Sequence, residues 1–258
     1  MNLSFTVYGD GPPLLILHGL FGSGRNWATI AKSLAPQRKI LTVDLRNHGE
    51  SPWNDEMNYS AMADDVLHLI EKENLEQPTL LGHSMGGKVA MVAAMTEPDA
   101  IGSLVVADIA PVSYGHSHDP YVEAMQSLDL STVQRRGEAD VALSVAIHDK
   151  GVRGFLLHNL VFEDEGPRWR LNLEAIASNM VSLTDFPIPP TEGGFSGPSM
   201  FIVGAKSDYV RPDHHAAIRQ FFPASSILMI PDAGHWLHAE KPAEFIQTVT
   251  EFLAGLTP

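Results

Sequence analysis

The chain reads Thr79-Leu80-Leu81-Gly82-His83-Ser84-Met85-Gly86-Gly87 where a short apolar run meets a helical segment. Within this run, Gly-His-Ser-Met-Gly matches the pattern Gly-x-Ser-x-Gly, in which a strand turns sharply into a helix. Side chains at Gly82 and Gly86 would collide with neighbouring backbone in so tight a turn, and the serine hydroxyl is left exposed above the helix N-terminus. We predict that Ser84 is a nucleophile, because the alternative, a helix cap that serves Gly87, does not explain glycines on both sides.

Short apolar runs alternate with helical patterns on both sides of this turn. Such alternation is typical of a parallel sheet with helices on both faces. The expected strands are residues 14–17, 40–43, 79–81, 103–107, 200–203 and 227–230. The expected helices are residues 26–34, 60–74, 88–95 and 243–253. We therefore predict the α/β fold class, with a mostly parallel central sheet flanked by helices.

The segment from residue 112 to residue 197 interrupts this alternation. Its helical patterns cover residues 121–128, 133–148, 152–161 and 173–183, and a Pro- and Gly-rich return linker runs from Phe186 to Gly194. Because the segment stands between two strands of the C-terminal half of the sheet, we expect it to lie over the carboxyl ends of the strands, where open α/β sheets place their sites. The predicted division is an α/β core of residues 1–111 and 198–258, with a helical lid of residues 112–197.

The composition excludes several classes of function. The chain has 258 residues and a net charge of −14, and such a surface repels phosphate backbones and anionic lipid heads, so we expect no nucleic-acid partner. The absence of cysteine excludes a thiol nucleophile and cysteine-ligated metals, and it fits a reducing cytoplasm. No apolar run approaches the roughly 18–20 residues of a membrane span. We expect no metal, since His116 and His118 stand in a Gly-flanked loop typical of solvated histidines. The oligomeric state is not indicated.

The segment after the last expected strand supplies a candidate base. It reads Pro231-Asp232-Ala233-Gly234-His235. A histidine that follows a strand end and a flexible glycine can reach over the site, take the serine proton and return it to the leaving alkoxide. We predict His235 as the general base. Among the other histidines, His83 is fixed in the turn, His238 is expected at a helix start, and His214 on a solvated helix face.

Two backbone amides are candidates for an oxyanion hole. The amide of Met85 stands at the helix N-terminus, where it points at the oxyanion. The second donor is expected in the loop after the first strand, His18-Gly19-Leu20-Phe21-Gly22. Leu20 is the first choice there and Phe21 the second. We expect Leu20, Phe21, Met85 and Trp236 to contact the substrate.

At this point the chain resembles the α/β-hydrolase family over essentially its whole length. His18-Gly19, the segment from Asp44 to Ser51, the turn at Ser84 and Gly234-His235 are similar to that family's landmarks, in the same order. Finer features resemble a branch of small carboxylesterases, the abhydrolase-domain esterases. These features are residues 18–23, 46–49, 82–88, 108–111 and 233–238. The resemblance implies a Ser-His-Asp triad that hydrolyses esters without a cofactor.

The same resemblance implies structural roles for three polar residues. His18 usually supports the oxyanion loop through hydrogen bonds, and Asp44 anchors the loop that follows it, together with Arg46. Asn47 stands where many family members carry glycine, which is a feature of the branch and affects nothing catalytic.

Two aspartates compete for the role of triad acid. In the family the acid usually follows the penultimate strand, where this chain reads Gly204-Ala205-Lys206-Ser207-Asp208-Tyr209-Val210. The family's spacing falls on Ser207, so Asp208 is one residue late. In the branch that this chain resembles, the acid follows the earlier strand, at Asp108. Because the two strands are neighbours in this fold, both aspartates can reach the same imidazole; we favour Asp108 and keep Asp208 as the alternative.

A serine at the turn narrows the chemistry. Haloalkane dehalogenases and epoxide hydrolases of this fold need an aspartate there. We predict a serine hydrolase that cleaves carboxylic esters with short to medium acyl chains, and its partner is a small-molecule ester. One alternative is a carbon–carbon bond hydrolase, whose substrate carboxylate could pair with Arg153, Arg168 or Arg170. The other is a ligand receptor without turnover.

Overall fold

The computed structural model describes residues 1–115, 117–187 and 194–256. In these residues the central sheet has seven strands, in the order β1-β3-β2-β4-β5-β8-β9. Strand β1 is antiparallel to β3, and all other neighbours are parallel. The strands are β1 (Ser4–Tyr8), β2 (Pro13–Leu17), β3 (Lys39–Asp44), β4 (Thr79–His83), β5 (Ser103–Ala107), β8 (Ser199–Gly204) and β9 (Ser225–Ile230). The predicted α/β class with a mostly parallel sheet is confirmed.

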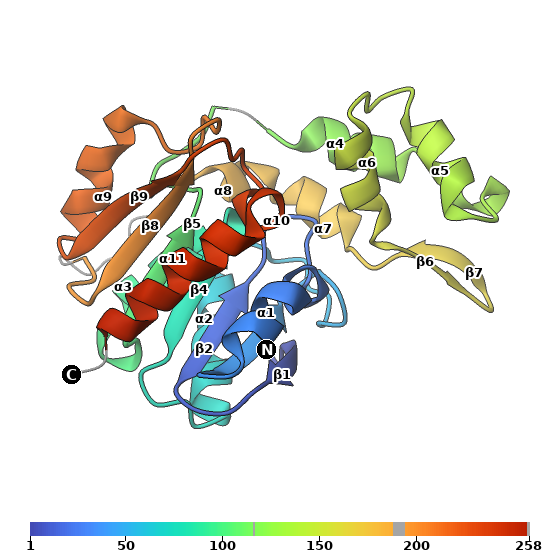
Figure 1. Cartoon of the computed structure of the whole chain (residues 1–258). Helices are drawn as coiled ribbons and strands as arrows, with labels where there is room; N and C mark the ends of the chain where they lie inside the picture. The colour runs from blue at the N-terminus through green and yellow to red at the C-terminus, as the bar shows by residue number, and fades with distance from the viewer. Residues whose placement is uncertain (116, 188–193, 257–258) are drawn as a thin grey trace.

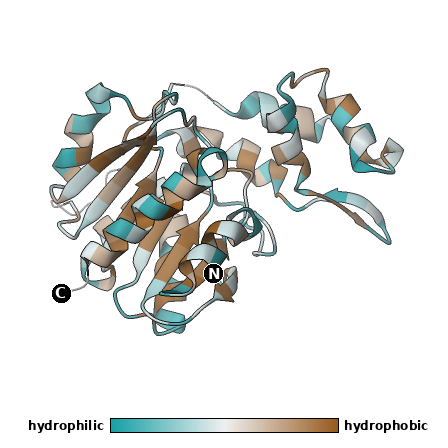
Figure 2. Cartoon of the chain, in the orientation of Figure 1, coloured by the Kyte–Doolittle hydropathy of each residue, from teal (hydrophilic) through white to brown (hydrophobic). Residues whose placement is uncertain are grey.

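Two helical layers cover the sheet because successive side chains of each strand point to opposite faces. On β2, Leu14 and Ile16 pack in the same apolar cluster as α1 (Ala28–Leu34) and α11 (Pro242–Gly255). Leu15 and Leu17 pack in the cluster that contains α2 (Tyr59–Lys72) and α3 (Met85–Thr96). The remaining core helices are α9 (His215–Phe221) and α10 (Leu237–Glu240). Figure 1 shows α1 and α11 in front of the sheet, and in Figure 2 the strands between the layers are mostly hydrophobic.

Three details of the core differ from the expectation. Strand β1 was not predicted, because it is a half-exposed edge strand of five residues. Helix α2 begins one residue before the expected Ser60, since the side chain of Asn58 accepts a hydrogen bond from the amide of Ala61 and caps the helix. Short 3-10 helices cover Gly24–Trp27, Pro98–Ala100, Leu130–Thr132 and Pro212–His214.

The segment between β5 and β8 has both helices and a small sheet. Its helices are α4 (Asp119–Gln126), α5 (Arg136–Leu143), α6 (Lys150–Leu157), α7 (Leu173–Ser178) and α8 (Met180–Thr184). Strands β6 (Leu160–Glu163) and β7 (Gly166–Trp169) form an antiparallel hairpin. The expected helix of residues 152–161 is therefore too long, because Leu160-Val161-Phe162 pairs with β7 across a turn that ends at Gly166, with φ 117°. The expected helix of residues 133–148 is also too long, since α5 covers only Arg136–Leu143. Residues 188–193 of the expected return linker lie outside the described residues.

Of the loops that leave the sheet at the carboxyl edge of its parallel strands, five position the site. The loops after β2, β4, β5, β8 and β9 all leave from carboxyl ends of neighbouring parallel strands. In Figure 1, α4 to α7 project beyond this edge. Across the parts of the chain that the structure describes, no helix combines the length and apolarity needed to cross a membrane.

Candidate active site

The turn between β4 and α3 holds Ser84 in a conformation that few serines adopt. Its φ is 52° and its ψ is −119°. A Cβ atom on Gly82 would lie 2.2 Å from the carbonyl oxygen of Gly86, and one on Gly86 would lie 2.3 Å from that of Leu17. Both distances are far below any real contact, so the turn needs glycine at both positions. The neighbouring backbone thus fixes the Ser84 hydroxyl at the start of α3.

A chain of hydrogen bonds runs from Ser84 to a buried carboxylate. Nε2 of His235, on the loop between β9 and α10, lies 3.1 Å from Oγ of Ser84. Nδ1 of the same ring lies 2.7 Å from Oδ2 of Asp108, whose side chain is fully buried at the end of β5. The amide of Gly204 donates to Oδ1 of Asp108 over 3.0 Å. The carboxylate is therefore oriented on both oxygens, and it faces the imidazole nitrogen remote from Ser84.

The structure brings Asp108 to His235, whereas Asp208 is exposed. Ser207 fills the register position that the family's spacing assigns to the acid, and its hydroxyl donates to Oδ2 of Asp108. Sequence reasoning missed this contact. The signal that could have found it is the register itself, since a residue one step before Asp208 points inward from the same loop.

Leu20 and Met85, which carry the candidate oxyanion amides, line one small cavity of about 30 Å³ together with Ser84. In the described part of the chain neither amide has a hydrogen-bond partner. Phe21, the second choice, differs, because its amide donates to Nε2 of His48 over 3.2 Å. An amide already bonded inside the protein is a poor donor to substrate, so the geometry favours Leu20 over Phe21.

His18 supports the loop that carries Leu20. The amide of Leu45 donates to Nε2 of His18 over 3.0 Å, so the proton sits on Nδ1, which donates to the carbonyl of Gly19 over 2.8 Å. Burial lowers the pKa of His18 to about 4, which keeps the ring neutral and able to make both bonds.

The loop after β3 is anchored in a different way from the expectation. Oδ1 of Asp44 accepts from the amide of Gly24 over 2.7 Å, and Oδ2 accepts from that of Glu50 over 2.9 Å. Arg46 does not pair with Asp44. Its guanidinium is buried and donates to Asp65 over 2.7 Å. Asp65 lies on α2, so Arg46 ties this loop to a helix rather than to its own strand.

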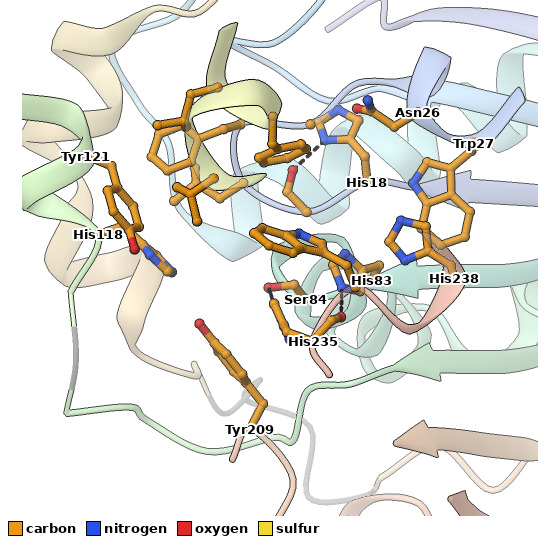
Figure 3. Close-up of a pocket in the computed structure, with 18 residues that line it drawn as sticks. His18, Asn26, Trp27, His83, Ser84, His118, Tyr121, Tyr209, His235 and His238 are labelled. Atoms are coloured by element: carbon orange, nitrogen blue, oxygen red, sulfur yellow. Dashed lines mark hydrogen bonds between the residues drawn. The ribbon is translucent and has the colours of Figure 1, made fainter. Parts of the chain in front are cut away.

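A larger cavity of about 230 Å³ opens beside Ser84 and His235 (Figure 3). The core contributes Leu20, Phe21, Trp27 and Trp236 to its wall, and the segment between β5 and β8 contributes His118, Tyr121, Val152, Phe155 and Leu156. Of the four predicted substrate contacts, Leu20, Phe21 and Trp236 line this cavity, and Met85 lines only the smaller one. The wall is mostly apolar, which suits a hydrocarbon group.

The histidines around His235 are neutral. Nε2 of His83 is 2.8 Å from the carbonyl oxygen of His235, and burial lowers the pKa of His83 well below its usual value. His238, at the start of α10 as expected, stacks on Trp27 at 4.1 Å, and burial lowers its pKa to about 3. His214 is buried, so its predicted place on a solvated face is wrong.

The residues considered for other chemistries do not gather at the site. Arg153 donates to Asp140 over 2.7 Å, Arg168 pairs with Glu163 at 2.6 Å, and none of the described residues that line the larger cavity is an arginine or a lysine. His116 lies outside the described residues, and within them no three His, Asp or Glu side chains are placed to hold a metal ion.

Comparisons with known proteins agree with this architecture. The profile of the alpha/beta hydrolase fold matches residues 12–242. The sn-1-specific diacylglycerol lipase ABHD11 of Mus musculus is 41% identical over 265 residues, which cover 98% of this chain and 86% of that protein. Esterase YbfF of Escherichia coli (strain K12) is 34% identical over 245 residues, which cover 95% of this chain and 94% of that protein. A solved structure, a marine microorganism esterase, is 39% identical with a TM-score of 0.94, and the match covers 97% of this chain and 99% of that one.

Proposed function

The chain belongs to the α/β-hydrolase fold family and is an ester-cleaving hydrolase, and we propose that Ser84, His235 and Asp108 form its catalytic triad. The observation that carries the proposal is the continuous line of contacts from Oγ of Ser84 through both ring nitrogens of His235 to Asp108, at 3.1 and 2.7 Å. Asp208 is not part of this line of contacts, because the residue is exposed to solvent.

The proposed reaction follows from the tautomer that this geometry favours. Asp108 accepts a hydrogen bond from Nδ1–H of His235, which keeps the proton on Nδ1 and leaves the lone pair of Nε2 facing Ser84. His235 takes the serine proton as Oγ attacks the ester carbonyl, and the amides of Leu20 and Met85 receive the developing oxyanion. The imidazolium then gives its proton to the departing alkoxide, leaving an acyl-enzyme. Water repeats the sequence, releases the acid and restores Ser84.

We propose that the larger cavity receives an acyl chain of short to medium length. Its volume of about 230 Å³ and its apolar wall of Val152, Phe155 and Leu156 support this assignment. These three residues lie on α6, so the proposal includes a lid of residues 112–197 over a core of residues 1–111 and 198–258. A cytoplasmic location remains part of the proposal, on the ground that the chain has no cysteine.

The test is hydrolysis of p-nitrophenyl esters from acetate to laurate, with Ser84→Ala measured beside the native chain. Native turnover that falls to background in Ser84→Ala, with a maximum at short or medium chains, is the expected result. Because the Mus musculus relative is named a diacylglycerol lipase, a diacylglycerol is included as a second substrate. An active Ser84→Ala variant would refute the assignment of the nucleophile. An inactive native chain would favour the carbon–carbon hydrolase or the receptor.

A further inference from the structure

The two ends of the segment between β5 and β8 are tied to each other and to the core. We call residues 113–114 and 183–185 the root of this segment. The amide of Tyr114 donates to the carbonyl of Thr184 over 2.9 Å. The buried ammonium of Lys88, one turn of α3 after Ser84, donates to the same carbonyl over 3.1 Å. The root is therefore fastened directly to the helix that begins at Ser84.

Two tyrosine hydroxyls then connect the root to different parts of the core. The hydroxyl of Tyr59, on α2, donates to the carbonyl of Leu183 over 2.7 Å. The hydroxyl of Tyr114 accepts from the amide of Ala110 over 2.9 Å and donates to the carbonyl of Tyr209 over 2.7 Å. Burial raises the pKa of Tyr114 above its usual range, so this hydroxyl keeps the proton that it donates.

The bonds of Tyr114 join the two loops that hold the triad acid. Ala110 stands two residues after Asp108 on the loop that follows β5. Tyr209 stands two residues after Ser207 on the loop that follows β8, and its amide lies 3.3 Å from the Ser207 hydroxyl that donates to Asp108. A single hydroxyl thus bridges both loops just beyond the carboxylate.

The second of these loops also covers the imidazole. The ring of Tyr209 is stacked on that of His235, with centroids 3.8 Å apart and an angle of 16° between the planes; both are labelled in Figure 3. His83, which is neutral, approaches the ring from another side at 4.7 Å. Asp108 holds the edge of the imidazole and Tyr209 holds its face, and an aromatic face stabilises a cation placed on it.

We propose that Tyr114 is a positioning residue for His235, and that its hydroxyl links the root of the inserted segment to the acid and to the aromatic face that hold the imidazole. The proposal rests on the catalytic role of Ser84, His235 and Asp108 proposed above. It assigns no contact with substrate to Tyr114. Its role is to hold Asp108 and Tyr209 in their positions around the imidazole of His235.

The experiment compares Tyr114→Phe with Tyr59→Phe. Each variant loses one hydrogen-bonded hydroxyl and keeps its ring against Lys88, whose ammonium lies 4.8 Å from the Tyr114 ring and 5.3 Å from the Tyr59 ring. The Tyr114 hydroxyl is bonded to both triad loops, whereas that of Tyr59 is bonded to Leu183 in the root. We expect similar losses of thermal stability in both variants. We expect kcat for p-nitrophenyl butyrate to fall roughly 10- to 100-fold in Tyr114→Phe alone, with KM little changed, because small displacements of a reacting group cost about this much.

Two further readouts separate positioning from general loosening. The acid limb of kcat/KM should move to lower pH in Tyr114→Phe only, since a less well-supported imidazolium gives up its proton more easily. The low-field proton NMR signal of the His235–Asp108 hydrogen bond should broaden or shift in the same variant only. Equal effects in both variants on kcat and on this signal, or no effect of Tyr114→Phe, would overturn the inference. The NMR signal needs no substrate, so it tests Tyr114 even if the native chain shows no Ser84-dependent turnover and the proposed function fails.

Discussion

Replacement of Asp108 by asparagine tests the triad most directly. Oδ1 of Asp108 accepts from the amide of Gly204 over 3.0 Å, while Oδ2 accepts from His235 and from the Ser207 hydroxyl. The amide oxygen of asparagine must keep the Gly204 bond, because two facing N–H groups would cost about 1–3 kcal/mol. The NH₂ group then faces Nδ1 of His235 and forces the proton onto Nε2, where it blocks proton abstraction from Ser84.

The expected loss in kcat for a p-nitrophenyl ester is roughly 10³- to 10⁴-fold, which corresponds to about 4–5.5 kcal/mol at about 1.4 kcal/mol for each factor of ten. The smaller figure applies if some molecules turn the asparagine NH₂ toward the amide of Gly204, which restores the Nδ1–H tautomer of His235. Asp208→Asn is the matched control, and because Asp208 is exposed it should keep its rate within about twofold. The reasoning would be refuted if the Asp108→Asn variant kept nearly the full kcat, or if Asp208→Asn lost a comparable part of its kcat.

Three further predictions concern the turn, Lys88 and the cavity. Gly86→Ala should lower the free energy of unfolding by about 2–4 kcal/mol in a denaturant titration, since its Cβ meets the carbonyl of Leu17 at 2.3 Å; Gly154→Ala, where a Cβ meets nothing within 4 Å, should cost nothing. Burial lowers the pKa of Lys88 from 10.5 to about 7. Between these two pH values the unfolded chain binds more protons than the native one. The free energy of unfolding should therefore increase by up to about 1.4 kcal/mol per pH unit as the pH rises. Lys88→Met should show no such increase from about pH 7.5 to pH 9. Phe155→Trp narrows the larger cavity and should reduce kcat/KM for laurate roughly tenfold while acetate is unchanged, whereas Phe162→Trp, at a position 42% exposed, should change neither.

The parts of the fold that the sequence predicts are those governed by local pattern. Buried parallel strands such as β4 and β5 read as continuous apolar runs, and these were confirmed. Strand β1 is half exposed, and β6 follows directly on α6, so neither gives a clear local signal. The turn at Ser84 has a local sequence pattern, and the limit on Gly82 is local too, because its Cβ would meet the carbonyl of Gly86; the limit on Gly86 comes from the distant carbonyl of Leu17.

The acid is the part of the site that local pattern could not decide. Asp108 and Asp208 both follow buried strands, and the choice depends on which side chain a loop turns inward. That direction is set by the pairing of β5 with β8 and by the bond from Gly204 to Asp108, which join residues about a hundred positions apart. The stacking of Tyr209 on His235 and the bridge made by Tyr114 arise in the same way.

The order of the proposed triad along the chain would allow the inserted segment to be exchanged. With the acid on the loop after β5, nucleophile and acid sit on two strands that pair directly, and both precede the inserted segment; only His235 comes after it. The insertion can therefore be exchanged for that of another hydrolase without separating Ser84 from Asp108. A graft of this kind must retain the Tyr114 hydroxyl and the two carbonyls that accept hydrogen bonds from Lys88. These contacts would fix a foreign segment to the loops that position His235. On the proposed assignments, such a graft would replace the part of the larger cavity's wall that the inserted segment contributes and would leave Ser84, His235 and Asp108 in the core.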